Sequence, residues 1–266
     1  ALAEGRGDRL PETVLGMVEA RLEALPAEAR RLLRAASVFG EAFSRGGALA
    51  LLGEGERIDA ARTWLPWLVD REVLVRRGTA RSAVEEEYAF RHALLREGSY
   101  AMLTADDRVL GHRLAAEWMA GTGSGADARA VIVGEHFFRA EAWDEAARAF
   151  TRGGEAAERL HANVEARLHY GRALEALRRM PDAVAARRRR VDTMIAKVAV
   201  SYGDDPAPNL ALLAEAEAIA TGLPDAATAP SEDYRRVARV HFWMGRCHWY
   251  RNAYPEAIGY YQRTLA

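Results

Sequence analysis

The sequence predicts a mainly α-helical protein, with one small β-hairpin in its first half and stacked antiparallel helices in its second half. Apolar residues recur at three- and four-residue spacing along most of the 266 residues, which is the period of an amphipathic helix. Only residues 72–76 and 87–91 are short and β-branched or alternate between apolar and polar. The glycine-rich segment 121–125 separates the two halves, and its composition is that of a flexible linker.

Three helices are predicted before the hairpin. The first begins at Pro26, a residue suited to a first helical turn, and ends at Gly40. The second covers residues 44–52. The third starts near Ile58, and Pro66 inside it should kink or break it, because proline lacks the N–H that a helix needs.

The hairpin and the helices after it complete the first half. Residues 77–86 between the two strands are polar and include a glycine, as expected for a hairpin loop. Three helices followed by a two-stranded hairpin predict a winged helix. Two further helices are expected at 92–103 and 106–120, with Asp106 placed to cap the second.

The second half reads as one helix after another, with turns marked by Gly, Pro and Asn. Segments of about 12–20 residues joined by short turns predict stacked antiparallel hairpins. The expected helices are 128–140, 143–160, 163–180, 183–202, 209–221, 233–250 and 254–265.

Two of these hairpins resemble tetratricopeptide repeats. That repeat has a small residue and then an aromatic in its first helix, followed by an Ala-x3-aromatic pattern in its second helix. The first match consists of Gly134, Phe137, Trp143, Ala146, Phe150 and Gly153. The second consists of Gly245, His248, Tyr254, Ala257 and Tyr261. The small residues are expected to let the helices approach closely, while the aromatics fill the space between hairpins.

The repeat is irregular in the middle of the predicted stack. Ala166, Tyr170 and Ala173 repeat the second-helix pattern too soon after Ala146 for a regular 34-residue period. The period is also lost after Met180. A generic helical bundle is therefore the alternative to a tetratricopeptide-like superhelix.

The chain as a whole resembles part of the STAND-type signal-transduction NTPases, a group of bacterial regulators. The most specific segment is 88–100, which is similar to the Phe-Arg-His-Ala-Leu…Ala-Tyr signature that closes the winged helix of that family. Segments 10–14, 20–26 and 29–40 are similar to the region just after its ATPase core, and 135–137 and 162–166 to its helical repeats.

This resemblance implies a division of the chain into the tail of an ATPase arm, a winged-helix module, a linker and tetratricopeptide-like repeats (residues 1–26, 27–120, 121–126 and 127–266). It implies that the ATPase module lies elsewhere in a longer chain and binds ATP or ADP there, so that no cofactor is expected in this segment. It also implies that His92 corresponds to the nucleotide-sensing histidine of the family. The other reading of His92 is a residue that caps or bridges the junction between hairpin and helix.

No enzymatic motif is present, and the chain is expected not to be an enzyme by itself. The single lysine, Lys197, lies in an apolar helical stretch, so a Walker A motif is excluded. The sequence contains no His-Glu-x-x-His, Cys-x-x-Cys or Gly-x-Ser-x-Gly. Cys247 is the only cysteine, which leaves neither a disulfide framework nor a thiolate metal site.

We expect the repeats to bind a protein, a peptide or a small-molecule inducer, and the winged helix to contact the ATPase module of the same chain. The formal net charge of −1 provides no overall positive potential that would attract nucleic acid. No apolar run reaches the about 20 residues that are needed to span a bilayer. The start of the sequence has no signal-peptide pattern. A cytoplasmic location is therefore expected.

Sequence-specific DNA binding by the winged helix is the alternative function. The third helix, however, offers mostly apolar residues in 64–69, with Arg62 and Arg71 at its margins. On the wing, Arg76, Arg77 and Arg81 could contact only phosphates.

Two further groups of residues remain open from the sequence. Arg187 to Arg190 wrap round a helix, which predicts a solvated surface, with a phosphate or acidic-partner site as the alternative. Packing is the expected role for most members of a group of aromatics, with exposed contact as the alternative (Trp243, Trp249, Tyr250 and Tyr254).

Overall fold

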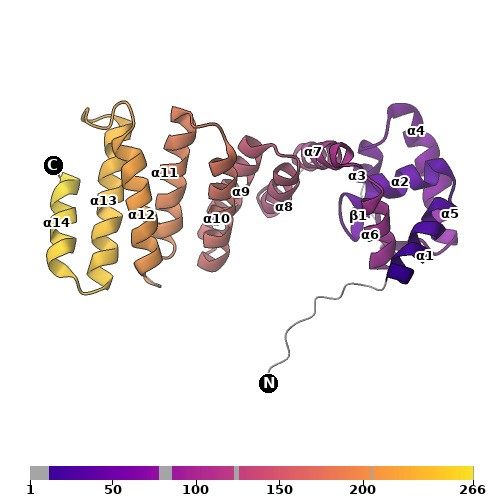
Figure 1. Ribbon diagram of the computed structural model, residues 1–266, viewed down its shortest axis with the longest axis horizontal. Helices are drawn as coiled ribbons and strands as arrows, with labels where there is room; N and C mark the ends of the chain where they lie inside the picture. The colour runs from indigo at the N-terminus through magenta and orange to yellow at the C-terminus, as the bar shows by residue number, and fades with distance from the viewer. Residues whose placement is uncertain (1–11, 78–85, 123–125, 205, 266) are drawn as a thin grey trace, which may run out of the picture. The chain divides into compact units, whose positions relative to one another are not determined.

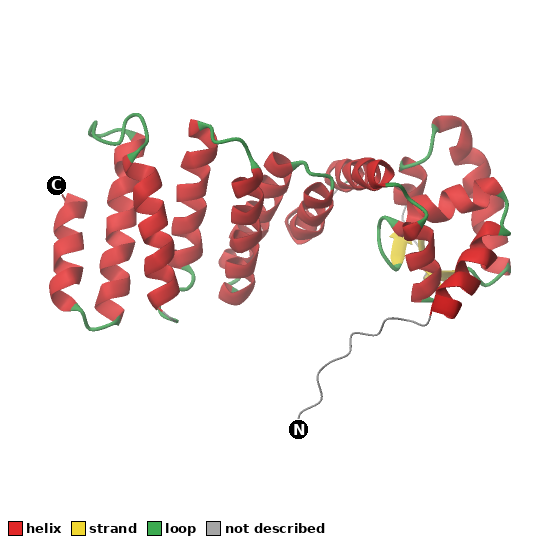
Figure 2. Ribbon diagram, in the orientation of Figure 1, coloured by secondary structure: helices red, strands yellow, loops and turns green. Residues whose placement is uncertain are grey.

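The computed structural model describes residues 12–77, 86–122, 126–204 and 206–265. The chain forms two compact units, residues 1–122 and 123–266, and each is described here by itself. The protein is mainly helical, as the sequence predicts, with a small three-stranded antiparallel sheet in the first unit and a stack of helices in the second (Figures 1 and 2).

The first unit is built from short helices around the sheet. Its helical elements are α1 (Glu12–Glu23), α2 (Ala27–Ser37), α3 (Arg45–Ala50), α4 (Glu54–Asp59), the π-helical turn Ala60–Trp64, α5 (Leu65–Asp70), α6 (Ala93–Ala101) and α7 (Ala105–Gly121). Helix α1 packs against α6, where a Cβ added to Gly98 would lie 2.9 Å from Leu22 Cδ1. Leu22 is buried there, in the core of the first unit.

The sheet consists of β1 (Ala42–Ser44), β2 (Leu74–Arg77) and β3 (Glu87–Phe90), in the order β1-β3-β2. The two predicted strands pair as an antiparallel hairpin, and their loop, 78–85, lies outside the described residues. Strand β1 was not expected. The helix predicted to start at Ser44 starts instead at Arg45, because Ser44 ends the strand and its Oγ accepts the N–H of Gly47 at 3.1 Å.

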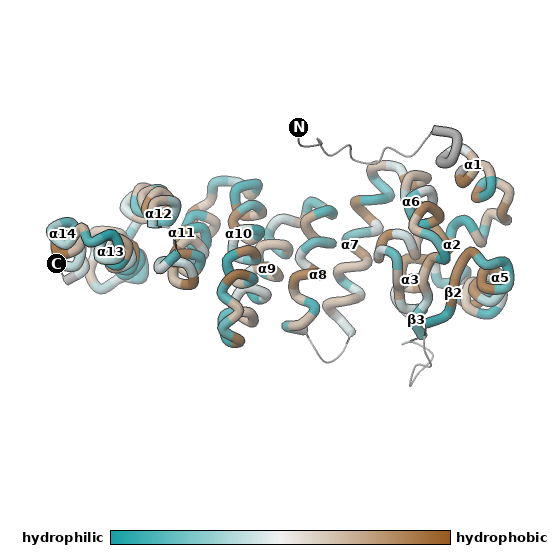
Figure 3. The backbone as a smooth tube through the Cα atoms, turned by 90° about the horizontal axis from the view of Figure 1, so that it is seen from below, coloured by the Kyte–Doolittle hydropathy of each residue, from teal (hydrophilic) through white to brown (hydrophobic). Residues whose placement is uncertain are grey.

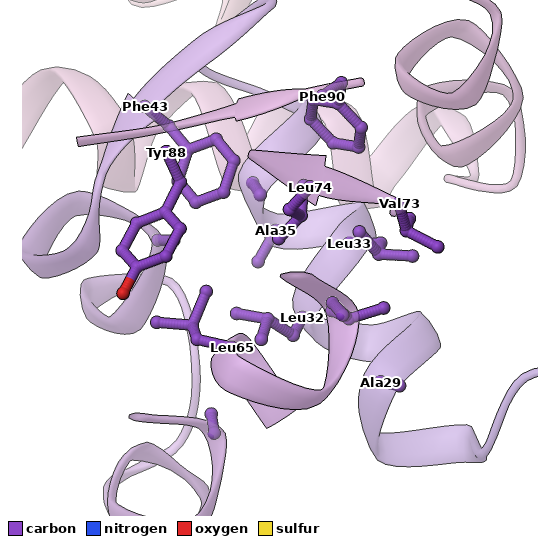
Figure 4. Close-up of a cluster of buried hydrophobic side chains, with 14 of the residues drawn as sticks. Ala29, Leu32, Leu33, Ala35, Phe43, Leu65, Val73, Leu74, Tyr88 and Phe90 are labelled. Carbon is purple, nitrogen blue, oxygen red and sulfur yellow. The ribbon is translucent and has the colours of Figure 1, made fainter. Parts of the chain in front are cut away.

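The core of the first unit lies between the sheet and α2 (Figure 4). Ala29, Leu32, Leu33 and Ala36 share one stripe of α2 and are all buried. On the sheet, three rings form a cluster in which Phe43 lies 6.0 Å from Tyr88 and 5.8 Å from Phe90, measured between centroids. The apolar stripe therefore favours a helix at α2, and this stripe packs against the aromatic cluster of the sheet.

Pro66 does not break the helix that contains it. Helices α4 and α5 are joined by the π-helical turn, in which the N–H of Leu65 bonds to the oxygen of Ala60, five residues back. This wider turn comes directly before Pro66, which has no N–H to place in the ladder. The expected cap at Asp106 is also wrong, because Thr104 Oγ1 accepts the Asp107 N–H in a capping box.

The second unit contains seven helices in its described part, each within about three residues of its predicted bounds. They are α8 (Ala126–Arg139), α9 (Trp143–Arg159), α10 (Asn163–Arg179), α11 (Val184–Ala199), α12 (Pro206–Thr221), α13 (Glu232–Tyr250) and α14 (Tyr254–Leu265). Of the linker predicted at 121–126, Gly121 is the last residue of α7 and Ala126 the first of α8, while residues 123–125 lie outside the described residues.

Three of the helix pairs share one hairpin design. Each has a glycine in its first helix. Seven residues after this glycine comes a residue with positive φ, twelve residues after it an alanine, and sixteen residues after it an aromatic residue. The three sets are Gly134, Glu141, Ala146 and Phe150; Gly154, His161, Ala166 and Tyr170; and Gly245, Asn252, Ala257 and Tyr261.

The turn and the glycine have distinct physical roles in this design. The φ angles at the turn are 54°, 57° and 59°, and an alanine N–H bonds back across each turn, as from Ala142 to the oxygen of Phe137 at 2.9 Å. A Cβ on Gly154 would lie 2.5 Å from the Tyr170 ring, and the other two glycines meet their aromatics at 2.8 and 2.6 Å. The helices of each pair are therefore as close as glycine alone permits.

The first two hairpins overlap, and this explains the irregular period. Helix α9 is both the second helix of the first hairpin and the first helix of the second. The second glycine consequently follows the first by only twenty residues, whereas Gly245 follows Gly154 by ninety-one. No regular 34-residue period relates the three hairpins.

Replacing Gly154 by alanine is expected to destabilise the second unit by about 1–3 kcal/mol, since the added methyl group overlaps the buried Tyr170 ring. Gly259→Ala in α14 is the matched control, because nothing lies within 4 Å of its added Cβ. That control should stabilise by about 0.5–1 kcal/mol. Urea unfolding measures both changes, and equal effects of the two substitutions would contradict the close packing at Gly154.

Candidate functional site

Ion pairs connect alternate helices of the stack from α8 to α13. Arg172 of α10 donates to Glu135 of α8 at 2.9 and 2.8 Å, and Arg178 of α10 pairs with Glu215 of α12 at 2.9 Å. On the other side, Arg189 of α11 pairs with Asp144 of α9. These contacts define two ranks of helices, α8, α10 and α12 against α9, α11 and α13, and Figure 3 shows α12 to one side of the line joining α11 and α13.

The arginine run 187–190 belongs to this ion-pair system and is not a solvated surface as predicted. Arg188 donates to both oxygens of Asp233 on α13, at 2.8 and 2.6 Å. Arg187 and Arg190 lie 3.9 and 3.6 Å from Asp182, and Arg190 also donates to the Leu177 carbonyl. All four guanidinium groups therefore have acidic partners within the chain.

Asp233 is the most buried member of the system, with 1% of its side chain exposed. It accepts from Arg188 and also from Arg236, which in turn pairs with Asp192 at 2.9 Å. The hydrogen bonds from Arg188 hold the pKa of the Asp233 carboxyl below its usual value. The interaction fixes α13 against α11.

An aromatic surface lies on α13 and the start of α14. Trp249, Tyr250 and Tyr254 are 51%, 47% and 45% exposed, so the packing role expected for most of the four aromatics is wrong for these three. Phe242 of α13 and Ile258 of α14 are also exposed, at 41% and 52%. We refer to these five residues as the α13–α14 face.

Neighbouring rings and one cation order the edge of this face. Tyr202 lies between Trp243 and Tyr250, at centroid distances of 5.3 and 5.1 Å, and the guanidinium of Arg246 lies 4.9 Å from its ring. A hydrogen bond from Tyr250, together with Arg246, lowers the pKa of the Tyr202 phenol. The edge thus carries positive charge and hydroxyl groups beside exposed rings.

The repeat residues singled out from the sequence divide between core and surface. Ala146, Phe150 and Ala257 are fully buried in the helix pairs, opposite or beside the close-contact glycines, whereas Tyr254 is exposed. Trp143 contacts Phe138 at 5.0 Å, with the two rings nearly perpendicular. Phe137 instead packs on the core of the second unit.

Sequence reasoning missed two features of the stack. Gly154 was not identified as the partner of Tyr170, although the sixteen-residue spacing from Gly134 to Phe150 would have found it. The positions of Arg172 and Arg246 carry no sequence signal, because arginine is common throughout the chain. Their neighbours are known only from the fold.

His92 of the first unit occupies the position before α6 and is exposed. Its carbonyl accepts the N–H of Leu95 at 3.0 Å, and its side chain forms no capping hydrogen bond. The imidazole therefore faces solvent, where another protein module or a ligand can contact it.

The surface of the α4–α5 helix is mixed in charge. Arg62 and Arg71 are exposed there together with Asp59 and Asp70, and Arg71 stacks on Trp67 at 4.3 Å. On the hairpin, Arg76 pairs with Glu86, which is only 18% exposed and also lies 3.7 Å from Arg45. Arg81 lies outside the described residues.

Each unit also has a cleft. One of about 260 Å³ in the first unit is lined by Arg34, Leu52, Asp107 and Leu110 among others, and one of about 500 Å³ in the second unit lies at the α9–α10 turn. Within the described residues no group of three His, Cys, Asp or Glu side chains is placed to hold a metal ion. None of the described helices is both long and apolar enough to cross a membrane.

The chain matches no family model, no curated protein and no solved structure. Function is therefore inferred from the geometry of the two units.

Burial raises the pKa of the Cys247 thiol to about 11, which makes it a poor nucleophile at neutral pH. Exposed aromatics beside an arginine are a composition typical of protein-binding surfaces.

Replacing Asp233 by asparagine is expected to cost about 2–3 kcal/mol at pH 7, because two arginines lose a buried charged acceptor. The lowered pKa of Asp233 means that its contribution is complete above about pH 4, the unfolded value. It is lost as the pH falls through the lower folded value. Urea unfolding of both proteins from pH 7 to pH 3 should therefore show the difference shrinking at acid pH.

Asp59→Asn, at an exposed position of the first unit, is the control for this experiment. A difference between Asp233→Asn and the native protein that stays constant down to pH 3 would contradict the ion-pair explanation.

Proposed function

We propose that this chain is a non-catalytic regulatory and protein-interaction region of a STAND-type ATPase. In this proposal the helical stack binds a partner or effector, and the first unit couples that event to a nucleotide switch elsewhere in the chain. The observation that carries the proposal is the exposed α13–α14 face on a stack of repeated hairpins. Stacks of this kind offer extended surfaces that bind partners without catalysing a reaction.

The arrangement of the first unit supports a winged-helix role. Its strand β1 lies between α2 and α3, and the β2–β3 hairpin follows the α4–α5 helix. That order of helices and strands is the one expected of a winged helix. The resemblance of residues 88–100 to the family signature falls on β3 and α6, so the same segment supplies both a sheet strand and His92.

Coupling through the first unit is favoured over DNA binding. A recognition helix needs basic and polar side chains free to enter the major groove. On the α4–α5 helix the arginines alternate with aspartates, Arg57 donates to the Leu52 carbonyl, and Arg71 stacks on Trp67. A surface of mixed charge suits contact with another protein module.

The coding sequence on both sides of this segment tests the proposal. A Gly-x-x-x-x-Gly-Lys-Ser/Thr motif after a predicted strand, upstream of residue 1, is the expected result. A complete gene without such a motif would remove the nucleotide switch and leave a helical binding module alone.

His92→Gln is expected to leave the stability of this chain within about 0.5 kcal/mol of the native value, because the side chain is exposed and caps nothing. In the parent ATPase the same change should weaken ADP binding about tenfold or more, since a charge-assisted hydrogen bond is lost. Urea unfolding and nucleotide titration measure the two effects. Unchanged nucleotide affinity would contradict the sensing role of His92.

A further inference from the structure

The only lysine of the chain extends from α11 to α10. Lys197 lies on α11 and is the single lysine among the 37 lysine and arginine residues. A Cβ added to Gly171 of α10 would lie 3.6 Å from its Nζ. The ammonium group is therefore held against a residue that has no side chain to pair with it.

Two arginines lie on the same stripe of α10 as this glycine. Arg167 precedes Gly171 by four residues, and Arg178 follows it by seven. These spacings place all three residues on one side of a helix. We refer to Lys197, Arg167 and Arg178 as the Lys197 cluster.

Both arginines pair with carboxylates of the next helix in the same rank. Arg167 pairs with Asp204, which precedes α12, at 2.8 Å, and Arg178 pairs with Glu215 of α12 at 2.9 Å. Each pair joins residues 37 positions apart, and in that register Gly171 corresponds to Pro208. Because neither of these two residues has a hydrogen-bonding side chain, neither can bind the ammonium of Lys197 through one.

A neighbouring arginine shows how a partly buried cation is usually neutralised in this stack. Arg172 of α10 contacts the carboxylates of both Glu135 and Glu175. Lys197 is partly buried as well, but no carboxylate of the described residues pairs with its ammonium. Its positive charge is therefore not neutralised within the described part of the fold.

The Lys197 cluster consequently has an excess of positive charge, because its three cations face two carboxylates. Arg167 donates from Nη1 alone and Arg178 from Nη2 alone, so their other N–H groups have no acceptor among the described residues. Burial, followed by repulsion from Arg178 and Arg167, lowers the pKa of the Lys197 ammonium. An anion in contact with the ammonium would offset this repulsion.

We propose that the Lys197 cluster binds a phosphate group, either free or carried by a small molecule, through the ammonium and the open N–H groups of the two arginines. A phosphate group carries up to about two negative charges at neutral pH and has several acceptor oxygens, which suits three clustered cations. All of the donors come from α10 and α11, so the site needs no second protein. The proposal rests on the proposed function, in which the stack binds an effector, and names the class of that effector.

The single lysine allows this site to be measured directly in the 266-residue chain. With isotope-labelled lysine, Lys197 gives the only lysine signal in an NMR spectrum, and sodium phosphate is added at constant ionic strength. We expect a saturable shift of this signal, with a dissociation constant of about 1 mM or lower. Bound phosphate should also raise the pKa of Lys197, because it favours the charged form.

Two substitutions of Gly171 form a matched pair. Gly171→Asp places a carboxylate beside Lys197 and should weaken phosphate binding about tenfold or more, because it occupies the ammonium and repels the anion. Gly171→Asn has nearly the same size without the charge and should change the affinity less than about threefold. The added Cβ makes an ordinary contact at 3.6 Å, so both variants are expected to fold, which circular dichroism and urea unfolding check.

Substitutions of the lysine itself separate its charge from its shape. Lys197→Gln should weaken phosphate binding about tenfold, whereas Lys197→Arg should keep the affinity within about threefold. Calorimetric titration measures these variants, since they lack the lysine signal. Arg152→Gln, at an exposed position of α9, is the control for the loss of one positive charge elsewhere in the stack.

Glycerol phosphate distinguishes the two sources of the phosphate group. Tighter binding than that of inorganic phosphate assigns the site to a phosphate ester, and equal or weaker binding assigns it to free phosphate. The proposal is overturned if phosphate gives no saturable shift, if Gly171→Asp binds it as well as Gly171→Asn does, or if succinate binds as tightly as phosphate.

Failure of this proposal and failure of the proposed function are distinguishable. Absence of a nucleotide-binding motif upstream would overturn the ATPase switch but would leave these titrations unaffected. Absence of phosphate binding in a chain whose gene does encode that motif would overturn only the effector class proposed for the Lys197 cluster.

Discussion

The stack depends on one contact, made three times, between a glycine in one helix and an aromatic ring in the next. At Gly134, Gly154 and Gly245 the space for a Cβ is already occupied by Phe150, Tyr170 or Tyr261. This close approach sets the separation of the two helices, and the left-handed residue between them sets the direction in which the chain returns. Because the contact involves only adjacent helices, hairpins can overlap or be spaced apart without altering it.

Ion pairs between alternate helices extend these local contacts into a continuous stack. Arg172, Arg188 and Arg189 each join helices that are not neighbours in sequence, and Asp233 is buried between two arginines. Such pairs contribute orientation more than net stability, since desolvation offsets much of their attraction. They keep the ranks of helices in register and so position the exposed rings of α13 and α14 as one surface.

Apolar residues generally occur where another element of the fold covers them, and this rule applies both to the core and to the proposed binding surface. It explains the stripe of α2 against the sheet and the burial of Ala147 in the core that α9 shares with α10. Trp249 and Ile258 are exceptions, because they are apolar but about half exposed among the described residues. A surface built like a core and left exposed is the strongest functional feature of the second unit, whereas the first unit contributes an exposed His92 at a helix start.

The sequence alone determined the helical class, the bounds of most helices and the β2–β3 hairpin, because periodicity and turn residues act over a few neighbouring positions. It also indicated the Ala-x3-aromatic pairs. Only the tertiary structure decided that β1 is a strand, since three residues become a strand by pairing with β3. The partners of the four arginines at 187–190 and the exposure of Trp249 were likewise decided by packing. Charge pairing and burial depend on which helices lie side by side, and Arg188 and Arg189 each meet an aspartate 45 positions away only through the fold.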